Sequence, residues 1–220
     1  MSDQRKIGFF GLMKPFDSAE CVFEHLPGGG MRASINHDLM SGMTIDQLIW
    51  WFHNIDQRTT FNGQDFTGAE VDCYKLWHPH DHVKVSWQKR LTSHDGQILP
   101  GSVIHIQEKF GSFSINERAV ISQFDGTAFN FEMRVLGIKV GHLLHLYKEV
   151  DLGVKYYTEM EIECRAPIVG RFITWLACKF FMPEPKMRAW MVHNVEEVGE
   201  SEKFIPQLYS DAMSLISSKN

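Results

Sequence analysis

Trp190-Met191-Val192-His193-Asn194-Val195-Glu196-Glu197-Val198 is the stretch that decides the fold, because it sets a histidine and two carboxylates inside a helical apolar pattern. At about 100° per residue, His193 and Glu197 lie one turn apart on the same face, and Glu196 points away from it. An imidazole and a carboxylate facing an apolar surface are costly unless they are hydrogen-bonded or bind a metal ion. The pair is therefore either a buried structural pair or part of a metal site.

Composition places the chain among globular proteins of ordinary core size. It has 220 residues, 44% of them hydrophobic, and a formal net charge of −5 with no long basic run, so nucleic acid is not expected as a partner. The four cysteines form no CxxC pair and no secretory leader opens the chain, which favours a cytoplasmic protein. We expect an irregular N-terminal segment over residues 1–43 that packs on one main domain over residues 44–220.

The most hydrophobic run, Phe172 to Met182, predicts a buried or subunit-interface helix. Lys179 interrupts it and Pro183 ends it, so it falls short of the roughly 20 residues that span a bilayer. We therefore expect no membrane partner. If the helix lies at a subunit interface, the protein is a homodimer.

After the N-terminal segment, the sequence predicts one short helix and then a histidine-rich loop. Thr44 to Gln47 has the form of a capping box and leads into an apolar helix over residues 48–53. In Tyr74-Lys-Leu-Trp-His-Pro-His-Asp-His82, Pro79 excludes a regular helix. The next residues alternate like a strand, which places His82 at a strand entrance.

Residues 102–164 read as five antiparallel strands separated by glycine-containing turns. Alternation puts Glu108 on an apolar face of the first of these strands and His142 on that of the fourth. In the last strand it turns Tyr156 inward and Tyr157 outward. Helices over residues 170–182 and from 186 to about 215, kinked or restarted at Pro206, end the chain. The fold class is α+β, with a curved sheet that grips a long C-terminal helix.

Four polar residues from separate elements are thus expected at one apolar interior: His82, Glu108, His193 and Glu197. Two imidazoles and two carboxylates suit a zinc ion, Zn²⁺. His78 and His80 compete with His82 for the first ligand position.

Two stretches carry a family resemblance, Tyr74 to His82 and His193-Asn-Val-Glu-Glu197-Val-Gly continuing to Phe204-Ile-Pro-Gln-Leu-Tyr209. They resemble the signature stretches of the diacetylphloroglucinol hydrolase family, which includes phloretin hydrolase. The resemblance, from about Thr44 to Tyr209, implies a START-like helix-grip fold and one zinc ion bound by His82, Glu108, His193 and Glu197. It further implies that Tyr74 holds substrate and that His142 donates a proton. A second substrate-binding tyrosine matches Tyr157 by spacing, although alternation favours Tyr156, and a bulge would reconcile the two.

The function expected from this resemblance is metal-dependent hydrolysis of the carbon–carbon bond between an acyl carbonyl and a phenolic, phloroglucinol-like ring, a retro-Claisen reaction on a small aromatic ketone. Two alternatives stay open. Helix-grip domains also bind aromatic or apolar small molecules without chemistry, and a metal-free polyketide cyclase needs cavity acid–base residues but no zinc.

Overall fold

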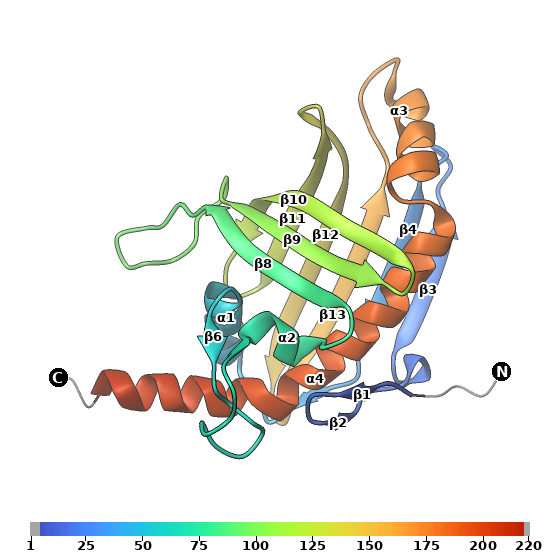
Figure 1. Ribbon diagram of the computed structural model, residues 1–220. Helices are drawn as coiled ribbons and strands as arrows, with labels where there is room; N and C mark the ends of the chain where they lie inside the picture. The colour runs from blue at the N-terminus through green and yellow to red at the C-terminus, as the bar shows by residue number, and fades with distance from the viewer. Residues whose placement is uncertain (1–4, 218–220) are drawn as a thin grey trace.

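A computed structural model describes residues 5–217, which form one curved antiparallel sheet around a long helix (Figure 1). The sheet is nine-stranded, its main path runs in the order β3-β4-β13-β12-β11-β10-β9-β8, and β5 adds to β13. The strands are β3 (Glu20–His25), β4 (Met31–Asn36), β5 (Met40–Ser41), β8 (His82–Lys89), β9 (Val103–Phe110), β10 (Phe113–Phe124), β11 (Ala128–Val135), β12 (Ile138–Val150) and β13 (Gly153–Ile162).

The five strands predicted over residues 102–164 are β9 to β13, and each pairs with the next through a short turn. At the β11–β12 turn, Leu136 and Gly137 both have positive φ, 50° and 82°. Two consecutive residues with positive φ make the kind of tight turn whose twist matches a hairpin. The predicted meander is therefore confirmed.

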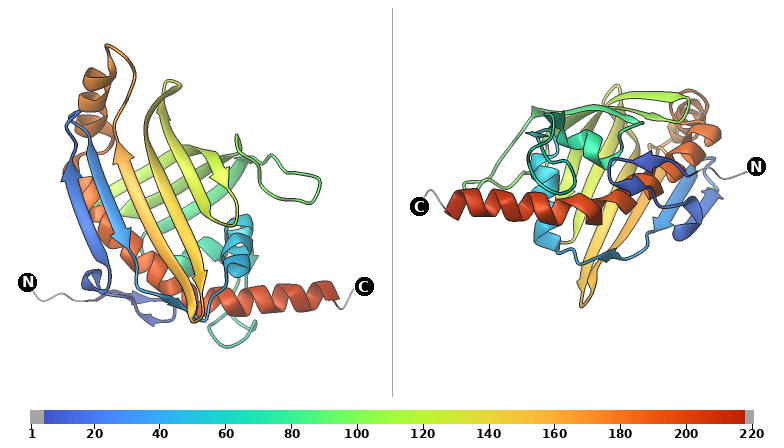
Figure 2. Two further views of the ribbon diagram at one scale, coloured as in Figure 1. Left: turned by 180° about the vertical axis from the view of Figure 1, so that it is seen from behind. Right: turned by 60° about the horizontal axis from the view of Figure 1, so that its bottom comes forward.

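The helices occupy the concave side and the ends of the sheet (Figure 2). They are α1 (Ile45–Asn54), α2 (Cys73–Trp77), α3 (Gly170–Leu176), the π-helical turn η2 (Ala177–Phe181) and α4 (Glu184–Ser217). The predicted capping box of α1 is present, with the Thr44 side chain accepting from Gln47 N and the Gln47 side chain accepting from Thr44 N. The remaining elements are short: β1 (Ile7–Gly8), β2 (Gly11–Leu12), η1 (Phe16–Ser18), β6 (Arg58–Thr59) and β7 (Val71–Asp72).

Helix α4 is continuous over 34 residues and contains Pro206. Figure 1 shows it changing direction along its length, as expected where proline removes a hydrogen bond and crowds the preceding turn. Its middle, from Trp190 to Leu208, packs its apolar side against the sheet and contributes to both buried clusters of the core. The sheet grips the helix, which confirms the α+β, START-like helix-grip fold class.

The expectation of an irregular segment over residues 1–43 is wrong for its second half. Strands β3 and β4 extend the main sheet, and β4 pairs along its whole length with β13. Met31, Ala33 and Ile35 alternate inward and are fully buried. The backbone hydrogen bonds to β13 stabilise a strand too short to show a clear period. Residues 1–4 lie outside the described part.

The segment after the sheet does not fit the buried alternative of its prediction, while the subunit-interface alternative stays a prediction. The apolar run from Phe172 is helical through Phe181, but Phe172, Trp175 and Phe180 are exposed. Within residues 5–217, no helix has the length and apolarity that a membrane crossing requires.

Candidate metal centre

Four predicted ligands meet at one point between the sheet and α4. His82 begins β8 and lies directly across from Glu108 on β9, while α4 supplies His193 and Glu197. Glu197 Oε2 is 3.1 Å from His82 Nε2 and 3.6 Å from His193 Nε2. Glu108 Oε2 is 3.7 Å from each of the same two nitrogens.

These separations fit donors around a single small cation. Atoms about 2.0 to 2.2 Å from a tetrahedral zinc ion lie roughly 3.3 to 3.6 Å from one another. His82, His193 and Glu197 also form a buried trio whose ligand atoms all lie within 4.8 Å. His82, His193 and Glu197 are therefore close enough to share one cation, and Glu108 lies slightly further out, at 3.7 Å from both nitrogens.

The hydrogen bonding of the two histidines supports the same conclusion. His82 Nε2 and His193 Nε2 are buried and, among the described residues, have no hydrogen-bond partner. The nearby carboxylate oxygens lie 3.1 to 3.7 Å from these nitrogens without forming a hydrogen bond to them. A buried nitrogen without a partner is costly, and a metal ion would remove that cost at both atoms.

The opposite nitrogen of each ring is held in place. His82 Nδ1 donates to the Tyr74 carbonyl oxygen at 2.7 Å, and His193 Nδ1 donates to Asp81 Oδ2 at 3.1 Å. Each ring therefore carries its hydrogen on Nδ1 and directs the Nε2 lone pair into the site. Metal-binding histidines are typically oriented by such bonds.

Tyr74 lies against the site from α2. Its ring stacks on His82 with the centroids 3.6 Å apart, and its hydroxyl donates to Glu108 Oε2. The structure therefore places Tyr74 beside the predicted ligands, with its hydroxyl bonded to the Glu108 carboxylate. Its role in holding substrate stays a prediction.

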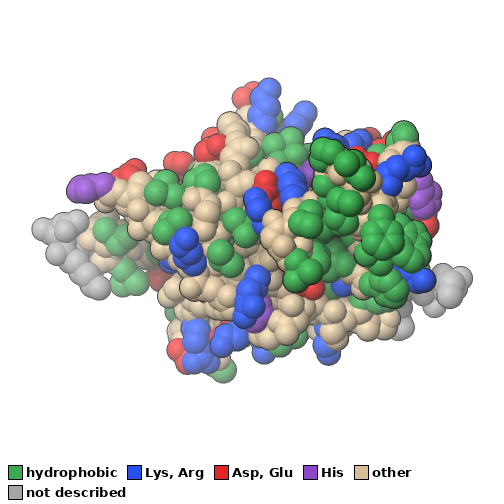
Figure 3. Space-filling model, turned by 90° about the horizontal axis from the view of Figure 1, so that it is seen from above, with side chains coloured by type: hydrophobic (Ala, Val, Ile, Leu, Met, Phe, Trp, Pro, Cys, Tyr) green, Lys and Arg blue, Asp and Glu red, His purple; other side chains and the backbone are tan. Residues whose placement is uncertain are grey.

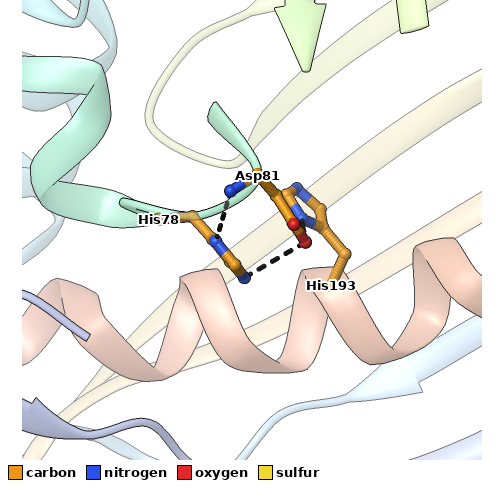
Figure 4. Close-up of side chains that lie close together, drawn as sticks. All are labelled: His78, Asp81 and His193. Atoms are coloured by element: carbon orange, nitrogen blue, oxygen red, sulfur yellow. Dashed lines mark hydrogen bonds and ion pairs between the residues drawn. The ribbon is translucent and has the colours of Figure 1, made fainter. Parts of the chain in front are cut away.

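A charged network lies behind His193 (Figure 4). His78 and His193 are on either side of the Asp81 carboxylate, and His78 Nε2 donates to Glu196 Oε2 at 3.1 Å. Lys6, from the N-terminal segment, reaches both Glu196 at 2.8 Å and Asp81 at 3.3 Å. His78, Asp81 and His193 also have metal-compatible spacing, but here the facing atoms already bond one another. We therefore assign this group to the support of His193.

His80 is exposed and bonds the Ile7 carbonyl oxygen. Of the three loop histidines, His82 is the one whose nitrogen faces Glu108 and Glu197. The prediction that Glu197 faces the site and Glu196 points away from it agrees with the observed contacts. Glu196 is nevertheless buried, because Lys6 and the N-terminal segment cover it.

A second chain of hydrogen bonds orients Glu197. Asn194 Nδ2 donates to Glu197 Oε1 at 2.6 Å, and Asn194 Oδ1 accepts from the Thr158 hydroxyl at 2.6 Å. His37 Nε2 in turn donates to Thr158 Oγ1 at 3.0 Å. With Oε1 engaged, Glu197 is left with Oε2 facing the two histidines.

Burial controls the ionisation of the four ligands. It raises the pKa of Glu108 to about 7 and that of Glu197 to about 8, and it lowers the pKa of His82 to about 4 and that of His193 to about 3. Both imidazoles are therefore neutral near pH 7, the form in which they bind metals. A divalent cation would balance the two carboxylate charges that burial disfavours.

A narrow cleft lies between the sheet and α4 and reaches the site at Glu108. Its apolar walls include Phe110, Phe131 and Trp190, and Glu108 lies within it. Arg118, Arg134 and Lys186 also line it, and its free volume is about 70 Å³. Two other tryptophans lie away from this cleft. Trp77 is buried with its indole donating to Ser201, and Trp50 lines a separate surface groove.

The prediction that His142 faces this interior is wrong. Met133 pairs with Gly141 and Arg134 with Lys139, so Val140 is an extra residue in β12. This bulge reverses the alternation after it. His142 consequently lies on the outer face, where it contacts Glu159 at 3.1 Å.

The same reversal turns His145 inward, which the alternation argument missed. His145 is buried between Phe131 and Tyr156, with ring centroids 5.5 and 5.9 Å away. Tyr156 is also buried and its hydroxyl has no hydrogen-bond partner among residues 5–217. Strands β12 and β13 pair without a bulge, so Tyr157 faces outward and donates to Glu159. Tyr156 is therefore the inward tyrosine.

Comparisons with known proteins add little to this geometry. No protein-family model matches the chain, and no curated protein is detectably similar. Among solved structures, a conserved protein of unknown function from Enterococcus faecalis has 8% identity and a TM-score of 0.47, covering 91% of this chain and 92% of that chain. A polyketide cyclase-like protein from Corynebacterium glutamicum has 13% identity and a TM-score of 0.38, covering 83% and 94%. Similarities this weak assign neither a family nor an activity.

Proposed function

We propose that this protein is a zinc-dependent hydrolase whose ion is held by His82, Glu108, His193 and Glu197. One observation carries the proposal: two buried imidazole nitrogens without hydrogen-bond partners among the described residues lie 3.1 to 3.7 Å from the carboxylates of Glu108, which is partly buried, and Glu197, which is buried. A purely structural cluster would be expected to pair these nitrogens with hydrogen-bond donors. A zinc ion in such a site supplies Lewis-acid polarisation of a carbonyl and a water nucleophile at neutral pH.

The substrate class that we propose is an acylphenol, and the reaction is hydrolysis of the bond between the acyl carbonyl and the ring. Water adds to the carbonyl carbon, the carbon–carbon bond breaks with its electron pair moving to the ring carbon, and that carbon takes a proton. The products are a carboxylic acid and the free phenol. Support comes from the resemblance of the two signature stretches and from the aromatic walls of the cleft. The cationic side chains Arg118 and Lys186 suit phenolate oxygens.

The chain's own residues then have separable tasks. Asp81 and the Tyr74 carbonyl hold the two imidazoles, and Asn194 holds Glu197. Since His142 lies outside, we assign the proton transfer to the interior pair of His145 and Tyr156. Burial raises the pKa of Tyr156 well above 10 and lowers that of His145 to about 4, so the hydroxyl is the donor and the neutral imidazole an acceptor.

Entry of an aromatic substrate requires the cleft to widen, because its free volume is small. Met133, Met160, Met182 and Phe181 line it, and methionine side chains adapt their shape at low cost. We therefore expect widening by side-chain movement between the sheet and the start of α4.

A metal-free polyketide cyclase or a binding protein for aromatic molecules is the second candidate. The Tyr74 hydroxyl donates to Glu108, whose pKa is about 7 and which lines the apolar cleft. Such an acid–base pair could act without metal. Either function would use the same cleft, so the metal distinguishes them.

Metal analysis of the purified, untagged protein separates these candidates. We expect about one zinc per chain, loss of zinc in Glu197→Gln and retention in Glu196→Gln, since Glu196 does not face the ligand nitrogens. Zinc well below one per chain after reconstitution would reject the hydrolase and favour the second candidate.

Turnover of acylphloroglucinols by the zinc-loaded protein tests the reaction class. His145→Gln and Tyr156→Phe should keep zinc and lower turnover by about 100-fold or more, as loss of acid–base catalysis does. His142→Gln is the matched control on the outer face and should remain active. Equal losses in all three variants would contradict the assignment of the interior pair.

A further inference from the structure

Two protrusions at one end of the molecule expose apolar side chains. In Figures 1 and 2, the β11–β12 hairpin tip and α3 rise at the same end of the sheet. We call residues 134–139 and 165–180 together the apolar rim. Its exposed apolar side chains are Val135, Leu136, Ile138, Ile168, Val169, Phe172, Trp175 and Phe180. Seen from above, hydrophobic side chains gather on this face (Figure 3). Exposed apolar groups gathered on one face mark an interaction site.

The charges of the rim are unlike those of the whole chain. No acidic residue occurs between Glu163 and Glu184, a stretch that contains Arg165, Arg171 and Lys179, although the chain carries a net charge of −5. The hairpin likewise has Arg134 and Lys139 and no acidic residue from 133 to 148.

Some of these cations form ion pairs with carboxylates that lie outside the apolar rim. Glu132 pairs with both Arg134 and Lys139, and Glu161 pairs with Arg165. Arg171 and Lys179 form no ion pair with a described carboxylate, so the rim as a whole carries excess positive charge.

Lys179 lies among the exposed aromatic rings. Its ammonium nitrogen is 4.9 Å from the Trp175 ring centroid and 5.2 Å from that of Phe180. The opposite side of the same segment, with Thr174 and Ala177, is buried. A short helical segment with an aromatic outer face and lysine or arginine beside it has the composition of elements that lie in a membrane interface.

We propose that the apolar rim docks this protein onto the surface of an anionic lipid bilayer. Tryptophan and phenylalanine side chains would enter the headgroup region, and Arg171 and Lys179 would face the lipid phosphates and carboxylates. A second copy of the chain fits less well, because a symmetric contact would set Arg171 and Lys179 of both copies together with no acidic rim residue between them. This proposal departs from the expectation of no membrane partner, which rested on the lack of a membrane-spanning segment, because docking on a bilayer surface requires no such segment.

Docking would also bring the cleft close to the lipid. Phe181, Met182 and Lys186 line the cleft, where Phe181 is the last residue of η2 and Lys186 lies in the first turn of α4. An apolar ligand dissolved in the bilayer could then enter without crossing water. Docking itself rests on the rim alone and does not depend on the proposed hydrolase function.

Co-sedimentation of the full-length protein with lipid vesicles tests the proposal. We expect binding to vesicles of phosphatidylcholine with a quarter phosphatidylserine, weaker binding to phosphatidylcholine alone, and weakening by high salt. Lys179→Ala should lower the partition coefficient about fivefold, and Phe172→Ser with Trp175→Ser about tenfold or more.

Leu152→Ser provides the matched control. Leu152 is 74% exposed and lies in the β12–β13 turn, at the end of the sheet opposite the β11–β12 turn. It should bind vesicles like the parent protein, and circular dichroism should show every variant folded. Failure of the parent to sediment with anionic vesicles would overturn the proposal. A stable dimer by light scattering that the Phe172 and Trp175 double variant converts to monomer would also overturn it, since a second copy would then cover the rim.

Discussion

Replacing Asp81 with asparagine should weaken zinc binding about 10- to 100-fold, the usual cost of removing the partner that orients a ligand histidine. The Asp81 carboxylate is 5% exposed and accepts from His193 Nδ1 at 3.1 Å. Although burial alone would raise the pKa of Asp81, its hydrogen bond with His193 and the charges of His78 and Lys6 lower it on balance, so it is ionised near neutral pH. Asparagine keeps the shape but loses the charge that polarises the imidazole.

Glu196→Gln is the matched control for this change. Glu196 shares the contacts of Asp81 to Lys6 and His78 but does not touch His193. Both variants should therefore lose similar stability without metal, while Asp81→Asn alone loses zinc affinity. Competition against a chromophoric chelator gives the affinity, and urea unfolding of the metal-free proteins gives the stability. Equal zinc affinity in the two variants would refute the role of Asp81 in orienting His193.

Three further outcomes follow from single contacts. Asn194→Ala frees Glu197 Oε1, so zinc affinity in the same competition assay should fall about tenfold, and an unchanged affinity would show that the Asn194 bond is dispensable. In the metal-free protein, burial lowers the pKa of His145 to about 4, whereas the pKa in the unfolded chain is 6.5. As the pH falls below 6.5, the unfolded chain therefore binds the proton before the folded protein does, and the folded state loses stability. The unfolding free energy should fall by at most about 2 kcal/mol between pH 7 and pH 5 through this group. Urea unfolding of His145→Gln should show a pH dependence smaller by that amount. Parallel pH profiles for the variant and the parent would contradict the prediction. Thr44→Ala removes the α1 cap and should lower the unfolding free energy by about 1 kcal/mol, and no change would mean that α1 is held by packing alone.

Local periodicity predicted much of the site because its key residues lie on regular elements. The helical phase of α4 separates Glu197 from Glu196, and alternation in β9 places Glu108 among apolar neighbours. Pro79 ends α2 before β8, so His82 is held at the first residue of a strand. In each case a neighbouring pattern of three to eight residues was enough.

The errors arise where tertiary contacts override that pattern. One extra residue at Val140 turns His142 outward and His145 inward. Because of this bulge, the adjacent residues Val140 and Gly141 are both buried. An uncharged stretch from Val140 to Tyr147 with two histidines contains no local feature that locates the bulge.

Support contacts between distant segments were also beyond local reasoning. Lys6 contacts Glu196 across 190 residues, and Thr158 contacts Asn194 across 36. Such pairs leave no period in the sequence. The one available signal was that Asp81 and Asn194 adjoin predicted ligands, His82 and His193, in the chain.

The most direct test of the metal centre is anomalous diffraction at the zinc absorption edge from crystals of the zinc-loaded protein. We predict one strong peak within about 2.0 to 2.2 Å of His82 Nε2, His193 Nε2 and a carboxylate oxygen of Glu108 and of Glu197. A peak at His78 and Asp81, a peak on the surface, or no peak at these four side chains would contradict the account.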